Sequence, residues 1–340
     1  MAEQQIEAGS MKKLWRFFPA LPALMLSGCT VDLLQPAGPI GEGNRDMMVL
    51  EWAVMMCVVV PVIIATLVFA WKYRASNTKA EYLRNWSHSN KIEVFIWGVP
   101  ILIILVLSGF NYWSTHYYDP YKPISKEMQV KVGAPDAKPL HVEVVSLDWK
   151  WLFIYPDLGI ATINELDVPT KTPLDFRITS DSVMTSFFIP QLGSQIYSMA
   201  GMETQLHLMA SRPGNFQGEA AQYTGPGFSD MRFRTIAMPQ EQFDAWVQNV
   251  RSGDNPLAAK EALDAQTYPK YHAAPAAPHA EAPKPAPVVY FSNVQSGLFE
   301  SIVAKYNVGM THENHGTSMG DKSMDMPAES HTAAPSNTGM

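Results

Sequence analysis

The chain has 340 residues, with 25 Lys and Arg against 32 Asp and Glu, and a formal net charge of −7 at pH 7. This weakly acidic balance argues against nucleic acid as a partner, because phosphate backbones attract basic surfaces. Only two cysteines occur, Cys29 and Cys57. The sequence beyond residue 57 therefore offers no disulfide framework and no thiolate-ligated metal site.

Residues 1–28 are typical of a secretory signal peptide. A basic stretch precedes an apolar core, and Leu26-Ser27-Gly28-Cys29 forms a small-residue processing site. A leucine three positions before a cysteine resembles a bacterial lipobox. This pattern predicts that Cys29 is lipidated with N-palmitoyl and S-diacylglycerol groups. A plain signal peptide with an incidental cysteine is the alternative.

Two long apolar runs predict membrane-spanning helices at 47–71 and 92–113. The uncharged run from Trp52 to Trp71 is about 30 Å long as a helix, which matches the hydrocarbon core of a bilayer. The loop between the helices, 72–91, carries an excess of basic residues: Lys72, Arg74, Lys79, Arg84 and Lys91 against Glu81. This excess places the loop in the cytoplasm and both outer ends in the periplasm, as in a bacterial inner-membrane protein.

Beyond residue 128 the sequence changes to short β-prone runs separated by turn residues. The runs lie at 141–146, 149–155, 173–179, 186–190, 204–210 and 231–238. Several short strands with such spacing predict a β-sandwich or barrel, and a helix is expected at 239–251. The predicted fold class is a membrane-anchored α+β protein, with a two-helix transmembrane hairpin followed by an all-β domain at 139–251.

The remaining segments are expected to connect these parts. Residues 29–46 and 114–138 lie on the periplasmic side of the two spans, and 252–271 follows the β domain. Residues 272–287 have the composition of a semi-rigid Pro/Ala linker. A short amphipathic helix is expected within 288–306.

The tail at 307–340 is rich in methionine and histidine and is expected to be disordered. Thioether and imidazole groups suit Cu(I), so a role in copper handling is one interpretation of this tail. The irregular spacing of these residues favours the other interpretation, a solvated low-complexity tail.

Several strings identify a specific resemblance. FAWKYRASN (69–77), NWSHSNKIE (85–93), VSLDWKWLFIYPDLGIAT (145–162), SFFIPQLGSQIYSMAGM (186–202) and YTGPGFSDM (223–231) resemble subunit II of haem–copper oxidases, in its cytochrome bo-type ubiquinol oxidase branch. The resemblance covers nearly the whole chain, although the 272–287 linker departs from it. It implies that the β domain has the cupredoxin-like topology and faces the periplasm.

Relatives that oxidise cytochrome c hold two copper ions in this domain, and the resemblance implies where their ligands would lie. Two bridging thiolates, imidazoles and a thioether supply that chemistry. In this sequence the two histidine positions hold Thr185 and Phe228, the two cysteine positions hold Ala220 and Thr224, the glutamate position holds Gln222, and only Met231 is retained. We therefore expect no metal and no cofactor in this chain.

The resemblance implies a proton-translocating ubiquinol oxidase in which subunit I carries the haems, the copper and the quinol site. The present chain would be a structural and assembly subunit that contacts subunit I, with subunits III and IV and membrane lipid as further partners. The alternative function is a free-standing cupredoxin-like lipoprotein that handles copper through its tail. A transmembrane hairpin after a lipid anchor favours the first function, because it implies a membrane partner.

Glu93 stands at the cytoplasmic start of the second span and is the candidate proton entrance. The resemblance places the opening of a proton channel here, and an ionisable group at a membrane boundary can collect protons. The alternative is an acid that interacts with the positive end of the helix dipole. The aromatic run Trp149, Trp151, Phe153 and Tyr155 is expected to pack in a core or against subunit I, and His207 is expected to be structural.

Overall fold

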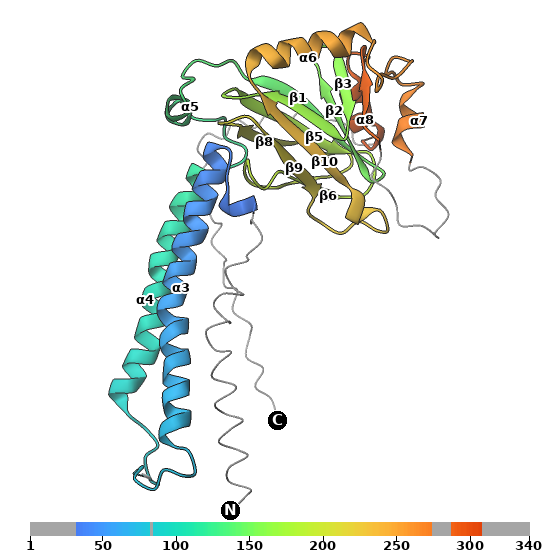
Figure 1. The fold of residues 1–340 in the computed structure, drawn as a ribbon. Coiled ribbons are helices and arrows are strands. Elements are labelled where there is room, and N and C mark those ends of the chain that lie inside the picture. The colour runs from blue at the N-terminus through green and yellow to red at the C-terminus, as the bar shows by residue number, and fades with distance from the viewer. Residues whose placement is uncertain (1–31, 82–83, 274–286, 308–340) are drawn as a thin grey trace, which may run out of the picture. The chain divides into compact units, whose positions relative to one another are not determined.

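The computed structural model describes residues 32–81, 84–273 and 287–307 (Figure 1). Cys29 and the signal segment lie outside the described residues, as do most of the Pro/Ala linker and nearly all of the Met/His-rich tail. The predictions made for those parts therefore stay predictions.

Two long helices form the N-terminal hairpin: α3 (Pro39–Lys72) and α4 (Asn90–Tyr117). Both are long and apolar enough to cross a membrane. Each extends beyond the span expected from hydropathy, since α3 has 34 residues and α4 has 28. A helix of 20 residues crosses the hydrocarbon at about 1.5 Å per residue, so the additional turns extend out of it. Pro39 suits the first turn of α3 because its fixed φ is helical and it needs no hydrogen-bond acceptor there.

The β domain is a sandwich of two sheets. The first has the strand order β11 (Val289–Phe291), β3 (Ile160–Ile163), β2 (Lys150–Tyr155), β1 (Leu140–Leu147), β5 (Pro173–Ser180), β8 (Thr204–Met209). The second has the order β4 (Glu165–Pro169), β10 (Arg232–Met238), β9 (Gly214–Ala220), β6 (Thr185–Phe188), β7 (Ile196–Ser198). Most neighbours are antiparallel, whereas β1 with β5 and β4 with β10 are parallel. All six predicted β-prone runs coincide with strands.

Strand β2 shows how the first sheet buries both of its faces. Trp151, Phe153 and Tyr155 point between the two sheets and join the main core. Leu152 and Ile154 point to the other face and join a second core. Successive side chains of a strand alternate between faces, so a strand that is buried along its whole length needs a cover on each side.

The C-terminal segment provides the second cover. A single short helix was expected within 288–306, whereas the structure forms strand β11 and then helix α8 (Leu298–Lys305). Together with α7 (Tyr268–His272), these elements place Phe291, Phe299 and Tyr268 in the second core. The packed domain therefore continues well past residue 251, the end predicted from the sequence.

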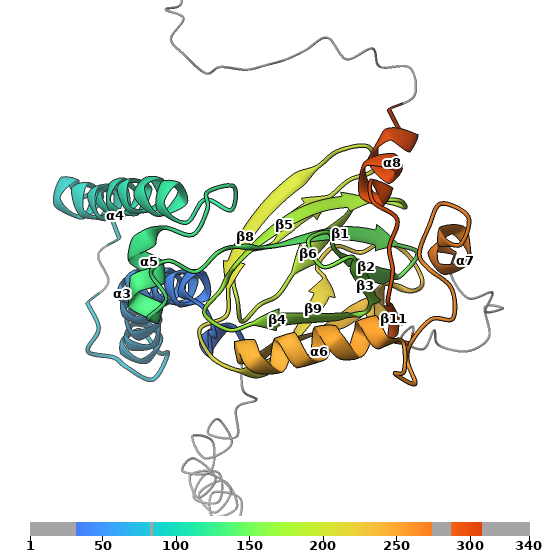
Figure 2. The same ribbon diagram turned by 90° about the horizontal axis from the view of Figure 1, so that it is seen from above.

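Two further helices complete the domain. Helix α5 (Lys126–Val132) lies within the segment expected to be a plain connector, and Ser125 caps it by accepting a hydrogen bond from the Met128 amide at 3.3 Å. Helix α6 (Gln240–Ser252) confirms the helix predicted after the last β-prone run. It runs beside β4 along one side of the sandwich (Figure 2) and buries Phe243, Val247 and Val250 in the main core.

The start of α3 is hydrogen-bonded to the β domain. The Ala37 amide donates to the Gln191 carbonyl at 2.7 Å, and the Gly41 amide donates to the Leu192 carbonyl at 3.0 Å. The Ser211 amide donates in turn to the Ala37 carbonyl at 2.7 Å. These backbone contacts join the first membrane helix directly to two loops of the sandwich.

Substitution of Gly43 by alanine is expected to weaken the junction of α3 and α4. A Cβ atom at this position would overlap the Tyr118 ring, which lies directly against the glycine. Overpacking of this kind typically costs about 1–3 kcal/mol. Gly98→Ala is the matched control, because a Cβ at Gly98 meets nothing within 4 Å. Thermal denaturation of the purified protein should show a lower midpoint for Gly43→Ala only; equal midpoints for the two variants would contradict the packing argument.

Candidate functional site

The loops expected to correspond to the copper site converge on one small pocket. Its volume is about 200 Å³, and Thr185, Thr224 and Met231 are among its lining residues. These three residues come from β6, from the loop at 221–231 and from the end of that loop. Three of the six positions that the resemblance implies therefore surround a common cavity.

Backbone contacts hold the loop at 221–231 against the sheet. The Ala220 amide donates to the Met231 carbonyl at 3.1 Å, which closes the base of the loop. Trp149 forms another wall of the pocket, and its ring lies directly against Gly227, where a Cβ would overlap it. Phe228 packs edge-on against Tyr223, with 5.6 Å between ring centroids.

The side chains around this pocket do not fit a dinuclear copper centre. Two of them, Thr185 and Thr224, place buried hydroxyl oxygens there without a hydrogen-bond partner among the described residues. Gln222, in the same loop as Thr224, also has a buried Oε1 without such a partner. The lining residues supply hydroxyls, the Asp148 carboxylate and the Met231 thioether, but neither a thiolate nor an imidazole, which copper centres of this type require. Within the described ranges, no group of three His, Cys, Asp or Glu residues is arranged to hold a metal ion.

Glu93 lies in the first turn of α4, and its amide donates to the Ser89 carbonyl at 3.0 Å. Its carboxylate is half exposed and faces His88, with 3.4 Å between Oε2 and Nε2. Glu93 was predicted from the sequence and His88 was not, although the two residues are only five positions apart. The pairing depends on the turn into α4, for which the sequence pattern gave no signal.

The aromatic run at 149–155 packs against the main core of the domain. Trp151 packs edge-on against Phe187 with 5.2 Å between centroids, and Phe153 contacts Phe233 at 5.0 Å. The Tyr155 hydroxyl donates to the Asp167 carbonyl at 2.9 Å. These contacts confirm the expectation of core packing for Trp151, Phe153 and Tyr155. Trp149 is partly buried against the same core and also lines the pocket.

His207 is structural, as expected, but its partners come from elsewhere in the chain. Its Nδ1 lies 3.0 Å from the Pro120 carbonyl, and its backbone amide donates to the same carbonyl at 3.2 Å. Its Nε2 faces the carboxylate of Asp175 at 3.6 Å on the neighbouring strand. The histidine therefore fastens the connector that follows α4 to the sheet.

Two carboxylates on β4 are buried at the edge of the second sheet. Burial, followed by the negative charge of Glu165, raises the pKa of Asp167 to about 8, and Arg234 offsets only part of this effect. Glu165 is hydrogen-bonded by the Tyr290 hydroxyl of β11. At neutral pH, Asp167 is therefore mostly protonated in the folded protein.

Stability is expected to fall as pH rises, because of Asp167. Its pKa is raised from 3.8 to about 8 on folding, so the folded state keeps a proton that the unfolded state releases between these values. The stability gained from that proton is complete below about pH 4 and is lost as pH approaches 8. Asp167→Asn should flatten this decline and raise the unfolding midpoint at pH 8. The exposed Asp136→Asn serves as control and should keep the wild-type slope; an unchanged slope in Asp167→Asn would contradict the assignment.

Asp181 joins the C-terminal segment to the loop between β5 and β6. Its side chain is fully buried and accepts from the Tyr268 hydroxyl at 2.9 Å and from Lys305 Nζ at 2.7 Å. Its carbonyl lies 2.7 Å from His272 Nε2 and accepts from the Tyr306 hydroxyl at 3.0 Å. The hydrogen bond to Asp181 raises the pKa of Lys305, which keeps the cation charged.

A second ionic cluster fixes the other end of α8. Arg177 of β5 contacts Glu143, Glu203 and Glu300 at 2.8–2.9 Å, and its guanidinium lies 4.8 Å from the centroid of the Phe299 ring. Burial and the neighbouring charge of Glu300 raise the pKa of Glu143 to about 7, although Arg177 lowers it. Neither cluster was visible in the sequence, because its members are far apart along the chain.

Comparison with known proteins identifies the two halves of this domain. The family profile of cytochrome c oxidase subunit II, periplasmic domain, matches residues 111–237, and the COX aromatic rich motif matches residues 258–310. The second match coincides with the segment that covers the outer face of the first sheet.

Relatives that match along most of the chain identify the branch of the family more specifically than the two profiles do. Ubiquinol oxidase subunit 2 of Acetobacter aceti is 56% identical over 288 residues, covering 85% of this chain and 87% of the relative. Cytochrome bo(3) ubiquinol oxidase subunit 2 of Pseudomonas aeruginosa is 47% identical over 316 residues, covering 92% and 86%. The chain belongs to the subunit II family of haem–copper oxidases, in the branch of ubiquinol oxidase subunit 2.

Family membership and the two apolar helices together define an inner-membrane protein with a domain of the periplasmic type. The predicted fold class, a transmembrane hairpin followed by a cupredoxin-like sandwich, is confirmed. These relatives do not favour the alternative of a free-standing lipoprotein that handles copper.

Proposed function

We propose that this chain is the structural and assembly subunit of a proton-translocating ubiquinol oxidase and that it carries no redox centre. The observation that supports this most directly is the donor set of the pocket at Thr185, Thr224 and Met231, which lacks thiolate and imidazole. Without a one-electron copper site here, electrons would reach the haems and copper of subunit I from a quinol within the membrane. Subunits III and IV would complete the complex.

Purification of the oxidase through an affinity tag on this chain tests the proposal. We expect a haem-bearing subunit I to co-purify, and we expect the preparation to reduce oxygen with ubiquinol and not with reduced cytochrome c. Metal analysis should show copper in proportion to subunit I alone. Two additional copper ions per complex, or oxidation of cytochrome c, would overturn the proposal.

We also propose Glu93 as the proton entrance of this complex. Its carboxylate is half exposed at the loop side of α4, and the His88 imidazole lies 3.4 Å away. An imidazole and a carboxylate can each bind and release a proton, so a His–Glu pair at the membrane boundary can take protons from water and pass them on. The test of this role is the Glu93→Gln variant described in the Discussion.

Lipidation of Cys29 is the remaining part of the proposal. It rests on the Leu26-Ser27-Gly28-Cys29 sequence and on the periplasmic position expected for the residues before α3. Mass spectrometry of the mature protein should show an N-terminus at Cys29 carrying diacylglycerol and an N-acyl chain. A mature N-terminus elsewhere, or an unmodified Cys29, would contradict it.

A further inference from the structure

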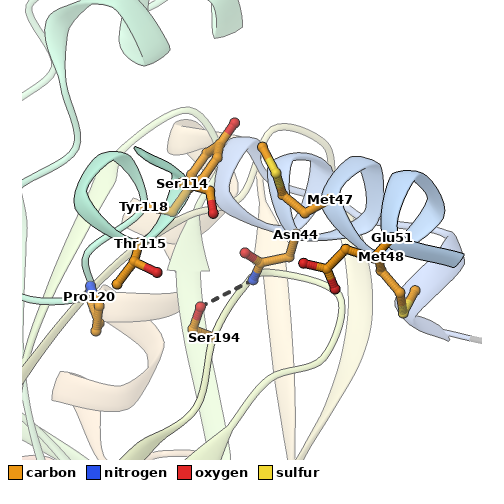
Figure 3. Close-up of a pocket in the computed structure, with 9 residues that line it drawn as sticks. All are labelled: Asn44, Met47, Met48, Glu51, Ser114, Thr115, Tyr118, Pro120 and Ser194. Atoms are coloured by element: carbon orange, nitrogen blue, oxygen red, sulfur yellow. Dashed lines mark hydrogen bonds between the residues drawn. The ribbon is translucent and has the colours of Figure 1, made fainter. Parts of the chain in front are cut away.

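A pocket of about 420 Å³ lies where the two membrane helices meet the β domain (Figure 3). Its polar walls come from three places in the chain: Asn44 and Glu51 of α3, Ser114, Thr115 and Tyr118 at the end of α4, and Ser194 of the sandwich. The Asn44 amide donates to the Ser194 hydroxyl at 3.1 Å, which joins α3 to the domain across the pocket. A pocket of this size falls within the range of about 300–1,000 Å³ that ligands occupy.

The helices fix the depth of this pocket relative to the membrane. Glu51 is the last ionisable residue before the uncharged stretch from Trp52 to Trp71. On α4, Trp113 and Tyr117 stack with 5.3 Å between ring centroids, beside the pocket residue Ser114. Aromatic side chains concentrate at the level of lipid headgroups. The pocket therefore lies at the headgroup level of the leaflet on the domain's side of the membrane.

The lining residues carry one charge, the carboxylate of Glu51, and none of them is Lys, Arg or His. A lipid with a net negative headgroup would find no cation here to balance it. A zwitterionic headgroup can place its ammonium on Glu51, while its phosphate oxygens accept hydrogen bonds from hydroxyls such as that of Thr115. A primary ammonium donates three hydrogen bonds and a quaternary choline donates none, so the carboxylate favours the former.

We propose that this pocket binds the headgroup of a phospholipid with a primary ammonium, of the phosphatidylethanolamine class. The acyl chains would extend along the apolar, exposed surfaces of α3 and α4 below it. The bound lipid would fill the space between the hairpin and the sandwich and support their junction. This inference depends on the membrane position of the helices and not on the substrate of the oxidase.

The test uses the complete oxidase complex, with Glu51→Gln compared with Glu127→Gln. Glu127 is an exposed acid on α5 outside the pocket, so it controls for the loss of one negative charge. After detergent exchange, the lipids retained by each complex are extracted and quantified by mass spectrometry. We expect the affinity of the Glu51→Gln complex for phosphatidylethanolamine to be roughly tenfold lower. This change corresponds to the loss of one charge-assisted hydrogen bond. Glu127→Gln should retain as much as the wild type.

A second measurement needs no variant. Delipidated wild-type complex is incubated with an equal mixture of phosphatidylethanolamine, phosphatidylcholine and phosphatidylglycerol, and should recover mainly the first. Equal recovery of all three lipids would overturn the proposal, as would unchanged retention in Glu51→Gln. Loss of subunit I from the Glu51→Gln complex would overturn it too, because the pocket would then be a contact with that subunit.

Discussion

Replacement of Asp181 by alanine is expected to detach the C-terminal segment from the β-sandwich and to lower the free energy of unfolding by about 3 kcal/mol. The side chain is fully buried and contacts Tyr268 and Lys305, both from the covering segment. Removing one partner of a buried ion pair leaves the other uncompensated, which typically costs about 3–5 kcal/mol. Lys305 is itself 56% exposed and can reach water, so the lower end of that range applies.

Asp181→Asn removes the charge of this side chain but keeps nearly the same shape, so it distinguishes the two contributions. The amide oxygen can still accept from the Tyr268 hydroxyl, but the ion pair with Lys305 is lost. We therefore expect a destabilisation smaller than that of alanine. The carbonyl of residue 181, which bonds His272 and Tyr306, remains in both variants.

The effect is measured on the purified oxidase by thermal denaturation and by limited proteolysis. Cleavage within 258–306 should become faster in Asp181→Ala, because this segment loses its connection to the loop before β6. Glu261→Ala is the control, since Glu261 forms an ion pair with Lys270 in which both side chains are at least half exposed. Such pairs contribute about 0–1 kcal/mol. A cleavage rate in Asp181→Ala equal to that of the control would show that Asp181 does not hold the segment.

The membrane hairpin and the main strands were predictable because their signals are local. An uncharged run such as Trp52–Trp71 requires no knowledge of distant residues, and the alternation in 141–146 predicts a strand. That strand is β1, although the structure buries it on both faces and not on one. Strands β3, β4, β7, β9 and β11 were missed, because their pairing and burial arise only when distant parts of the chain pack together. For β4, a sequence such as ELDVP with two acids gives no strand pattern of its own, and burial of Asp167 follows only from tertiary packing.

The candidate site was predictable in a different way. The resemblance placed Thr185, Thr224 and Met231 at corresponding positions, and the structure brings them to one pocket. Local sequence could not indicate that Trp149 closes this pocket over Gly227, since the two residues are far apart in the chain. The same separation hid the role of Asp181, whose partners lie 87 to 125 residues away.

Substitution of Glu93 by glutamine is expected to slow turnover of the oxidase on the order of tenfold, equivalent to about 1.4 kcal/mol in the activation barrier. The carboxylate can exchange protons and the amide cannot, while the two side chains have nearly the same shape. The KM for ubiquinol should stay unchanged, because the substitution lies at the loop end of α4 and the quinol site is proposed to lie in subunit I. Glu93→Asp keeps an ionisable group and should retain most of the activity.

Glu81→Gln is the matched control, since Glu81 is an exposed acid of the loop that precedes α4 and lies outside the first turn of that helix. Oxygen consumption and proton uptake are measured for both variants in proteoliposomes. If Glu93 acts only on the helix dipole, Glu93→Gln should lower stability by about 0.3–1 kcal/mol and leave turnover as it is. If it collects protons, turnover and proton uptake fall together while the unfolding midpoint changes little. The two roles therefore predict opposite pairs of results, and unchanged turnover with unchanged proton uptake would remove the proton-entrance assignment.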